Sequence, residues 1–471
     1  MIYNCIVKKT LGLKNLLILI ILLALIMSPR PLAGELELRA AYRFEAEGNH
    51  AGAASAYASA AARLPWIPSL WERAGKAALL DGDVENSILF FNQAVGRGSI
   101  SQWGWVDLGM AYQQRGDMPY AMNAWEQALP LAEAYGYLAQ AQQVAGNLPD
   151  AIKDWQASIA KEPDNASAHY HLGLLFTATA LKQAMPELMQ AVRLDPNLEK
   201  PVQGLRTALN TAFLSDNPAY QFLVSGQALA ALGQWALAAE AFRNALQENK
   251  GYAEAWAWLG QAKQQQNQDG SYEFTQALTL DPESAIVQGL YGIYLQHQGK
   301  PEAALVAYQI AADLEPNNPG WQMALGSAFE QTGDLINAYS NYSHAVELAP
   351  ENPSAWRALA DFSVNNIVDV DVTGLPAARK LIELAPDDWQ SFDLAGQAAF
   401  LLDDYTTAET YLKKAIQLAP TQAAPAFHLG LVYLQTGKLS SAYSYLNLAK
   451  TLDPMGSYGW QAGRLLEQVF P

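Results

Sequence analysis

Cysteine is almost absent from this sequence of 471 residues. The single cysteine, Cys5, precedes the apolar N-terminal stretch, so the body of the chain carries no thiol. A disulfide framework, a cysteine-based zinc cluster and a cysteine nucleophile are therefore excluded for the body of the chain. Cys5 also does not stand where a lipoprotein cysteine would, because such a cysteine follows the apolar run.

Charged residues are few, and the basic ones are the scarcer kind. They make up 16% of the chain, with 29 Lys and Arg against 46 Asp and Glu, for a formal net charge of −17. Lys8, Lys9, Lys14 and Arg30 lie in the first 33 residues, which hold no acid, so the remainder carries a net charge of −21. Nucleic acid is an unsuitable partner for so acidic a chain. The even spread of the acids favours a role in solubility, with attraction to a basic partner as the alternative.

Long hydrophobic runs are also lacking. The one extended run covers residues 16 to 27, shorter than the ~20 residues that a membrane helix needs. Lysines precede it and Ser28-Pro29-Arg30-Pro31 closes it, a pattern typical of an export signal. We predict a signal peptide or an uncleaved N-terminal membrane anchor over residues 1 to 33. Both alternatives place the remainder outside the cytoplasm, either secreted or anchored to the membrane by this segment alone.

What the sequence does contain is a repeated pattern, which is clearest over residues 285 to 318. Apolar residues recur at helical spacing from 286 to 297 and from 302 to 314, with Gly299-Lys300-Pro301 as a turn signal between them. Gly292 and Ala304 are small where two antiparallel helices would cross, and Tyr308 fills the seam. One such hairpin cannot bury both of its apolar faces, so it needs neighbours of the same shape.

The same register returns at intervals close to 34 residues, about a dozen times between residues 34 and 456. It consists of an aromatic residue, Leu-Gly, a second aromatic, and then Ala, an aromatic, Ala and Pro. Clear copies contain Leu108-Gly109, Leu325-Gly326, Ala395-Gly396 and Leu429-Gly430. This register resembles that of the tetratricopeptide repeat family. The resemblance implies an all-α fold, a right-handed superhelical solenoid of antiparallel helix pairs with about 12 repeats.

Departures from the register divide the chain. No copy fits between residues 197 and 218, although residues 202 to 214 suit one extra helix. The predicted organisation is N-terminal repeats over 34–198, an irregular helical connector over 199–218, C-terminal repeats over 219–456 and a capping helix over 457–471. The copy that begins at Trp356 has Ala360 in place of glycine and a longer loop over residues 364 to 375.

Polar residues do not converge as a catalytic site requires, so neither catalysis nor a cofactor is predicted. His169 and His171 are the only close pair of histidines. Their spacing directs the rings to different helix faces, and His169 stands at an aromatic core position, so packing is favoured over metal binding. Residues 369 to 374 begin like a calcium loop, but Lys380 stands where a bidentate Glu is needed. No metal site is therefore predicted.

The tryptophans invite a ligand-stacking interpretation, but most have a packing role in the register. The early aromatic position holds Trp71, Trp105, Trp256, Trp356 and Trp460, and the later one holds Trp125 and Trp155. Core packing is expected for all of these. Trp66, Trp103, Trp235, Trp258, Trp321 and Trp389 fall outside those positions. Packing between repeats is favoured for them as well.

The resemblance also implies that the first helix of each repeat lines an inner groove, where positions 2, 5, 9, 12 and 13 face a partner. Glutamine dominates these positions, and glutamine can both donate to and accept from an extended backbone. The candidate peptide-binding residues are Gln140, Gln143, Tyr170, Gln227, Gln261, Gln264, Gln265, Gln296, His297, Gln331, Gln397 and Gln435. Phe427 offers a further apolar contact. The alternative is that glutamine is simply a good helix former on a solvated face.

Some family members hold a terminal carboxylate with a clamp of Lys, Arg and Asn on this face. That clamp is largely absent, because Lys76 and Arg357 lie far apart with no asparagine ladder between them.

The leading hypothesis is a non-catalytic protein–protein interaction scaffold of bacterial type, which is exported or membrane-anchored. Its partner would be a protein or peptide segment of unknown identity, not nucleic acid. Alternatives are an assembly or stability factor for a cell-envelope complex, binding of envelope glycan through exposed aromatics, or an accessory subunit of a transferase or peptidase. A catalytic domain is disfavoured, because residues 199–218 and 364–375 are the only unassigned stretches and both are too short. Fold alone does not name the partner.

Overall fold

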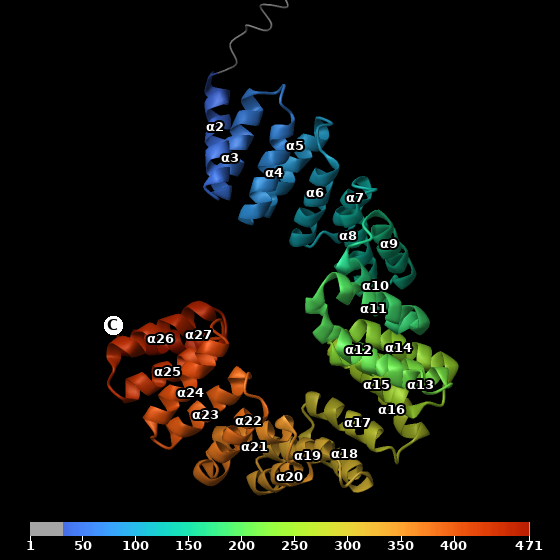
Figure 1. Cartoon of the computed structure of the whole chain (residues 1–471), viewed down its shortest axis with the longest axis vertical. Coiled ribbons are helices and arrows are strands. Elements are labelled where there is room, and N and C mark those ends of the chain that lie inside the picture. Colours follow the sequence, from blue (N-terminus) through green and yellow to red (C-terminus); the bar gives the residue numbers. More distant parts are fainter. Residues whose placement is uncertain (1–31, 471) are drawn as a thin grey trace, which may run out of the picture. The chain divides into compact units, whose positions relative to one another are not determined.

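The computed structural model describes residues 32 to 470, and all of its regular structure is helical, with no strand among these residues (Figure 1). Most of the predicted export or anchor segment, including Cys5, lies outside the described residues. Its last two positions open the first described helix, α2 (Leu32–Ala46). No helix in the described range is both long enough and apolar enough to cross a membrane.

The N-terminal unit ends at Leu214. Its described part consists of helix pairs followed by one single helix. The pairs are α2 with α3 (His50–Arg63), α4 (Ser69–Asp81) with α5 (Val84–Gly96), α6 (Gln102–Arg115) with α7 (Met118–Gln127), α8 (Ala132–Val144) with α9 (Leu148–Lys161), and α10 (Ala166–Thr179) with α11 (Leu181–Leu194). A 3₁₀ turn, η1 (Pro196–Leu198), leads into the single helix α12 (Glu199–Ala212). This helix occupies the stretch in which no repeat register fits.

The C-terminal unit begins at Ser215 and repeats the same arrangement. Its pairs are α13 (Pro218–Ala231) with α14 (Trp235–Glu248), α15 (Ala253–Gln265) with α16 (Ser271–Leu280), α17 (Ala285–His297) with α18 (Pro301–Leu314), α19 (Pro319–Thr332) with α20 (Leu335–Leu348), α21 (Pro353–Asn366) with α22 (Leu375–Leu384), α23 (Trp389–Leu401) with α24 (Tyr405–Leu418), and α25 (Ala423–Gln435) with α26 (Leu439–Leu452). The single helix α27 (Ser457–Val469) packs against α26 and α25.

The pair α17 and α18 shows how the register produces a hairpin. Gly299 ends the turn with φ of +68°, a left-handed conformation that suits glycine. Pro301 begins α18 at a position where its missing N–H costs nothing. A Cβ atom on Gly292 would lie 2.5 Å from Cε1 of Tyr308, and the Tyr308 side chain is fully buried in the seam. The two predicted helices and their crossing are confirmed. The absence of a side chain at Gly292 allows the ring of Tyr308 to pack closely against α17.

The C-terminal unit curves with its first helices on the inside. Consecutive first helices pack against one another from α19 through α21, α23 and α25 to α27, whereas consecutive second helices make no comparable contacts (Figure 1). Closer spacing on one side than on the other bends a stack of hairpins. Side chains on the free face of the first helices therefore line the inner surface of this unit.

One predicted loop is largely helical. We expected irregular structure over residues 364 to 375, but α21 continues to Asn366 and a π-helical turn, η2 (Val370–Gly374), runs directly into α22. Thr373 is buried, and its hydroxyl lies 3.3 Å from that of Tyr339. The segment that begins like a calcium loop is thus a helical turn packed on a neighbouring repeat. No group of metal-ligating side chains occurs among the described residues.

The tryptophan predictions are confirmed in part. Trp125 and Trp155 are buried, in agreement with core packing. Trp460 was expected to pack in the core as well, but 60% of it is exposed. The guanidinium of Arg464 lies 5.1 Å from the centre of this ring. Trp66 and Trp103 are also more than half exposed.

Candidate functional site

The inner face of α21 carries three polar side chains in one row. Arg357, Asp361 and Asn365 follow one another at intervals of four residues, which places them on one side of the helix. The opposite side holds buried residues such as Leu359 and Phe362, which anchor the helix in the core. The row therefore faces away from the core, toward the inner surface of the C-terminal unit.

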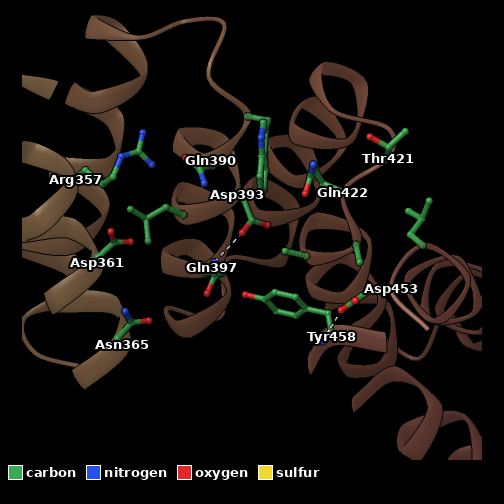
Figure 2. A pocket seen from close by; sticks show the side chains of 15 residues that line it. Arg357, Asp361, Asn365, Gln390, Asp393, Gln397, Thr421, Gln422, Asp453 and Tyr458 are labelled. Carbon is green, nitrogen blue, oxygen red and sulfur yellow. Dashed lines mark hydrogen bonds between the residues drawn. The ribbon is translucent and has the colours of Figure 1, made fainter. Parts of the chain in front are cut away.

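A cavity of about 630 Å³ opens beside this row, and we call it the acidic pocket (Figure 2). Side chains from α21, α23, the turn before α25, and α27 surround it, so three consecutive repeats and the last helix contribute. Its lining comprises Arg357, Asp361, Asn365, Trp389, Gln390, Asp393, Leu394, Gln397, Thr421, Gln422, Ala423, Ala424, Leu452, Asp453 and Tyr458.

Asp393 in the floor of the acidic pocket is held by its neighbours. Only 6% of this residue is exposed. Its Oδ2 accepts a hydrogen bond of 2.9 Å from Nε2 of Gln397, which Figure 2 shows. Its Oδ1 lies 2.8 Å from Nδ1 of His428 on α25. Both carboxylate oxygens are thus engaged, which a buried carboxylate requires. Asp393 fixes α23 to α25 and adds negative charge below the pocket.

Arg357 does not offer a free positive charge to the pocket. Its guanidinium donates to the carboxylate of Asp388, the residue that caps α23. Ser391 also donates to Asp388, over 2.6 Å. Burial would raise the pKa of Asp388, but these hydrogen bonds outweigh burial and hold that pKa below its usual range. The ion pair compensates the charge of Arg357.

Asp361 is the carboxyl group of the pocket that lacks such support. It accepts no hydrogen bond from the described residues. Burial raises its pKa to about 6, and the negative charges of Glu330 and Asp393 add to the rise, while Arg357 opposes it. The ionised form of Asp361 is therefore poorly stabilised by the protein itself, and a cation in the pocket would stabilise it.

A second cavity of about 280 Å³ adjoins the first, and we call it the apolar pocket. Asn365 and Gln397 line both cavities. The apolar pocket is lined by Val364, Asn365, Ile367, Gln397, Phe400, Leu401, Phe427, His428 and Leu431. Together the two pockets form a groove that runs across the first helices α21, α23 and α25, with a polar part and an apolar part.

Two of the residues predicted to contact a bound peptide, Gln397 and Phe427, lie in this groove. Gln397 forms part of the wall between the pockets, and Phe427 lines the apolar pocket. The remaining candidates are not brought together into one site. Gln140, Gln143 and Tyr170 belong to the N-terminal unit.

Several predicted glutamines are instead used inside the repeat stack. Gln261 is only 5% exposed. Nε2 of Gln264 lies 3.5 Å from the backbone oxygen of Tyr294 in the next repeat. Gln296 donates to the Ser327 hydroxyl over 3.2 Å and accepts from Tyr308 over 2.9 Å. Gln264 and Gln296 therefore connect helices, and Gln261 is buried with no partner for its Oε1 among the described residues, so none of the three is an exposed amide on the inner surface. Gln227 is half-buried, whereas Gln265, His297, Gln331 and Gln435 are exposed, and their role in binding stays a prediction.

Sequence reasoning missed the acidic part of the groove. All four polar residues stand at positions of the repeat that face the inner groove. These are position 5 for Arg357 and Asp393, position 9 for Asp361 and position 13 for Asn365. The register therefore placed these residues on the inner face, but glutamine is the commonest residue there and the predicted site consisted mainly of glutamines. Trp389 was expected to pack between repeats, and it also lines the acidic pocket.

The histidine pair has a structural role. His169 is buried, with Nδ1 2.6 Å from Oε2 of Glu187 and Nε2 3.0 Å from the backbone oxygen of Pro163. The ring of His171 stacks on that of Trp155. Burial lowers the pKa of His171. Both rings therefore connect α10 to its neighbours, as the register predicted for His169.

Comparison with known proteins agrees with this architecture. One family model described as a tetratricopeptide repeat matches residues 38–99, 223–285 and 292–353, and a second with the same description matches 390–422 and 425–454. A model described as a TPR repeat matches residues 145–179. The matches fall in both units and follow the helix pairs.

Curated relatives resemble parts of the chain. The BBSome complex member BBS4 of Bos taurus is 25% identical over 270 residues, 56% of this chain and 50% of that protein. The PEX5-related protein of Rattus norvegicus is 24% identical over 217 residues, 45% of this chain and 29% of that protein. The chain thus spans half or less of these relatives.

Among solved structures, the hetero-tetramer of the APC/C proteins Cut9 and Hcn1 contains a chain that is 14% identical to this one. The match covers 93% of this chain and 96% of that chain, with a TM-score of 0.48. Taken together, the repeated register, the helix pairs that it encodes and the family matches along both units show that the chain belongs to the tetratricopeptide repeat family.

Proposed function

We propose that this protein is a non-catalytic scaffold that binds an extended segment of a partner protein in the groove of its C-terminal unit. The observation that carries the proposal is the groove itself, in which two adjoining cavities cross the first helices α21, α23 and α25. A groove with polar and apolar parts suits a peptide, because main-chain and polar contacts fix its register while apolar side chains fill pockets.

The relatives support a role in protein interaction. BBS4 of Bos taurus is described as a member of a complex, the BBSome. That description does not identify the partner of this chain. The proposal therefore names the binding surface and the kind of partner, an extended polypeptide segment, and not a particular protein.

The place of action is a second part of the proposal. The basic flank and apolar run of residues 8 to 27 support export, with the repeats secreted or held at the membrane by the N-terminal segment. Mass spectrometry of the mature N-terminus together with cell fractionation tests this. An intact N-terminus in a soluble cytosolic fraction would contradict it.

The binding surface can be tested by crosslinking in cells. A photoreactive amino acid at Asn365, which lines both pockets, should capture a partner protein on irradiation. The matched control is the same amino acid at Glu347, an exposed position on the second helix α20. Capture at Asn365 alone, lost when Gln397→Trp obstructs both pockets, supports the proposal. Equal capture at both positions, unaffected by Gln397→Trp, would overturn it.

A further inference from the structure

We infer that the groove selects a partner segment in which an arginine and a large apolar residue stand two positions apart, with the arginine in the acidic pocket and the apolar side chain in the apolar pocket. This inference rests on the proposed function, and adds to it the chemistry of the bound segment. It is derived from the lining of the two cavities and from which of their charges are already paired.

The charge balance of the acidic pocket favours a cation. The one basic side chain in its lining, Arg357, is paired with Asp388. Asp453 caps α27, with its Oδ2 3.2 Å from the backbone nitrogen of Tyr458. Asp393 lies beneath the cavity, with its carboxylate oxygens engaged by Gln397 and His428. Asp361 remains without a hydrogen bond from the described residues, so the open group in the pocket is a carboxylate.

Charge on the neighbouring repeat strengthens this preference. Glu330 of α19 is held by Asn366, whose Nδ2 donates to its Oε1 over 2.7 Å, and by the hydroxyl of Tyr342 over 3.0 Å. Glu330 influences Asp361 electrostatically, as Asp393 does from the other side. Carboxylates from three consecutive first helices thus act on one cavity. An anionic ligand would be repelled, and a cationic one would relieve their mutual repulsion.

The aromatic lining favours arginine over lysine. Trp389 and Tyr458 line the same cavity as Asp361, and both are half-buried. A guanidinium is planar, stacks on aromatic rings and donates two parallel hydrogen bonds to a carboxylate, whereas an ammonium is a strongly hydrated point charge. Figure 2 shows Tyr458 on the α27 side of the cavity and Asp361 on the α21 side, with Asp393 between them. The walls of this cavity therefore offer an entering guanidinium both an aromatic ring and a carboxylate.

The wall between the two pockets explains why the arginine and the apolar residue of the bound segment stand two positions apart. Asn365 makes no hydrogen bond with the described residues, and Gln397 donates to Asp393 but leaves its Oε1 as an acceptor. These two amides can bond the backbone that joins the two anchoring side chains. In an extended segment, residues i and i+2 point to the same side about 6.5 to 7 Å apart. Adjoining pockets with one common wall therefore suit positions i and i+2.

The apolar pocket takes a large aliphatic or aromatic side chain. Phe400 and Phe427 line it from α23 and α25, and Leu431 continues the same face of α25. The acidic side chains do not line it. A leucine or phenylalanine buried here is removed from water, which adds to the affinity of the segment.

The test uses the full chain and labelled twelve-residue Gly-Ser peptides with one central motif, Arg-Ser-Leu, studied by fluorescence anisotropy. We expect Arg-Ser-Leu to bind, Lys-Ser-Leu to bind more weakly, and Glu-Ser-Leu and Arg-Ser-Ser to lose at least tenfold in affinity. Asp361→Asn should weaken Arg-Ser-Leu about tenfold, while Glu347→Gln, which removes an exposed acid elsewhere, should leave it unchanged. Circular dichroism verifies that each variant is folded.

Reversing the charge at position 361 distinguishes a loss of the arginine contact from a general loss of structure. Asp361→Lys should lose Arg-Ser-Leu and gain Glu-Ser-Leu, which a general loss of structure would not produce. If peptides crosslink at Asn365 with no preference for arginine, the inference about chemistry is overturned while the binding surface stands. If no peptide binds at about 1 mM and Asn365 captures no partner in cells, both proposals are overturned.

Discussion

Two stretches of the C-terminal unit use the inner positions of their first helices in different ways. In α15 to α18, the inner amides of Gln264 and Gln296 bridge to the next repeat. In α21 to α27, Asp361 stands at the register position that the buried Gln261 holds in α15, and Asp361 and Asn365 line open cavities. An inner position is thus not enough to make a binding residue. A polar side chain at an inner position is available to a partner only if it does not already form a hydrogen bond with the neighbouring repeat.

The helix crossings differ between the two stretches as well. Gly292 lets α17 and α18 pack closely around Tyr308. At the corresponding position α21 has Ala360, and α21 packs less extensively on α22, which the π-helical turn η2 precedes. The first stretch is therefore expected to contribute mainly stability, and the second mainly binding.

The largest expected effect is on the close crossing of α17 and α18. Gly292→Val places methyl groups where the ring of Tyr308 already lies 2.5 Å from a Cβ position, so we expect a loss of about 3 kcal/mol in the free energy of unfolding. Urea denaturation measures it. The matched control is Gly204→Val, since a Cβ at helical Gly204 meets nothing within 4 Å. Equal losses in both variants would show that the crossing is not tight.

A bridging glutamine should matter for stability and not for binding. Gln296→Leu removes the acceptor of the buried Tyr308 hydroxyl, and an unsatisfied buried hydroxyl costs about 2 kcal/mol. Urea denaturation of Gln296→Leu, Tyr308→Phe and the double variant should reveal strong coupling, because the second change removes the unsatisfied group. Additive losses would contradict the role of the bond, and a loss of peptide affinity would contradict the division between the two stretches.

Substitution of Asp361 should raise the free energy of unfolding, whereas substitution of Gln296 should lower it. Its pKa is raised to about 6 in the folded protein, so the folded state binds more protons than the unfolded state between about pH 4 and pH 6 and stability falls as pH rises through that window. Asp361→Asn should therefore be more stable than the native chain at pH 7 by about 1–2 kcal/mol, and no more stable at pH 4. Urea denaturation at both values checks this.

The ionisation of Asp361 should also affect the affinity for an arginine peptide. An arginine peptide needs the ionised carboxylate, so its affinity for the native chain should rise between pH 5 and pH 7. Arg357, Asp393, Glu330 and His428 also face this region, and all remain in Asp361→Asn. A pH dependence that survives in the variant would assign it to one of those groups instead.

The fold was predictable because it depends on local features that recur. Gly299, Pro301 and the small residue at Gly292 each specify a turn, a helix start or a crossing within one hairpin, and the repeat copies them along the chain. The π-helical turn before α22 was not predictable, since it depends on Thr373 packing against Tyr339 from another repeat. A contact between repeats leaves no periodic mark on the sequence.

The site was harder to predict for a related reason. The inner positions were known from the register, but whether a polar group is free depends on contacts such as those between Gln296 and Ser327 or between Arg357 and Asp388. Asp361 stands in a helix that reads as an ordinary amphipathic repeat helix. Only the pairing of its neighbours shows it as the open carboxylate.

The smallest effect concerns the glutamines that the structure leaves exposed. Gln331 and Gln435 stand near the C-terminal ends of the first helices α19 and α25, in contact with solvent. Since an exposed side chain without packing contributes little, Gln331→Ala and Gln435→Ala should each change the free energy of unfolding by less than about 0.5 kcal/mol. Neither residue lines the two pockets, so the affinity for an arginine peptide should also stay constant. If either variant weakens that peptide tenfold, the bound segment extends along the inner face beyond the groove, and the glutamine-rich surface is part of the site.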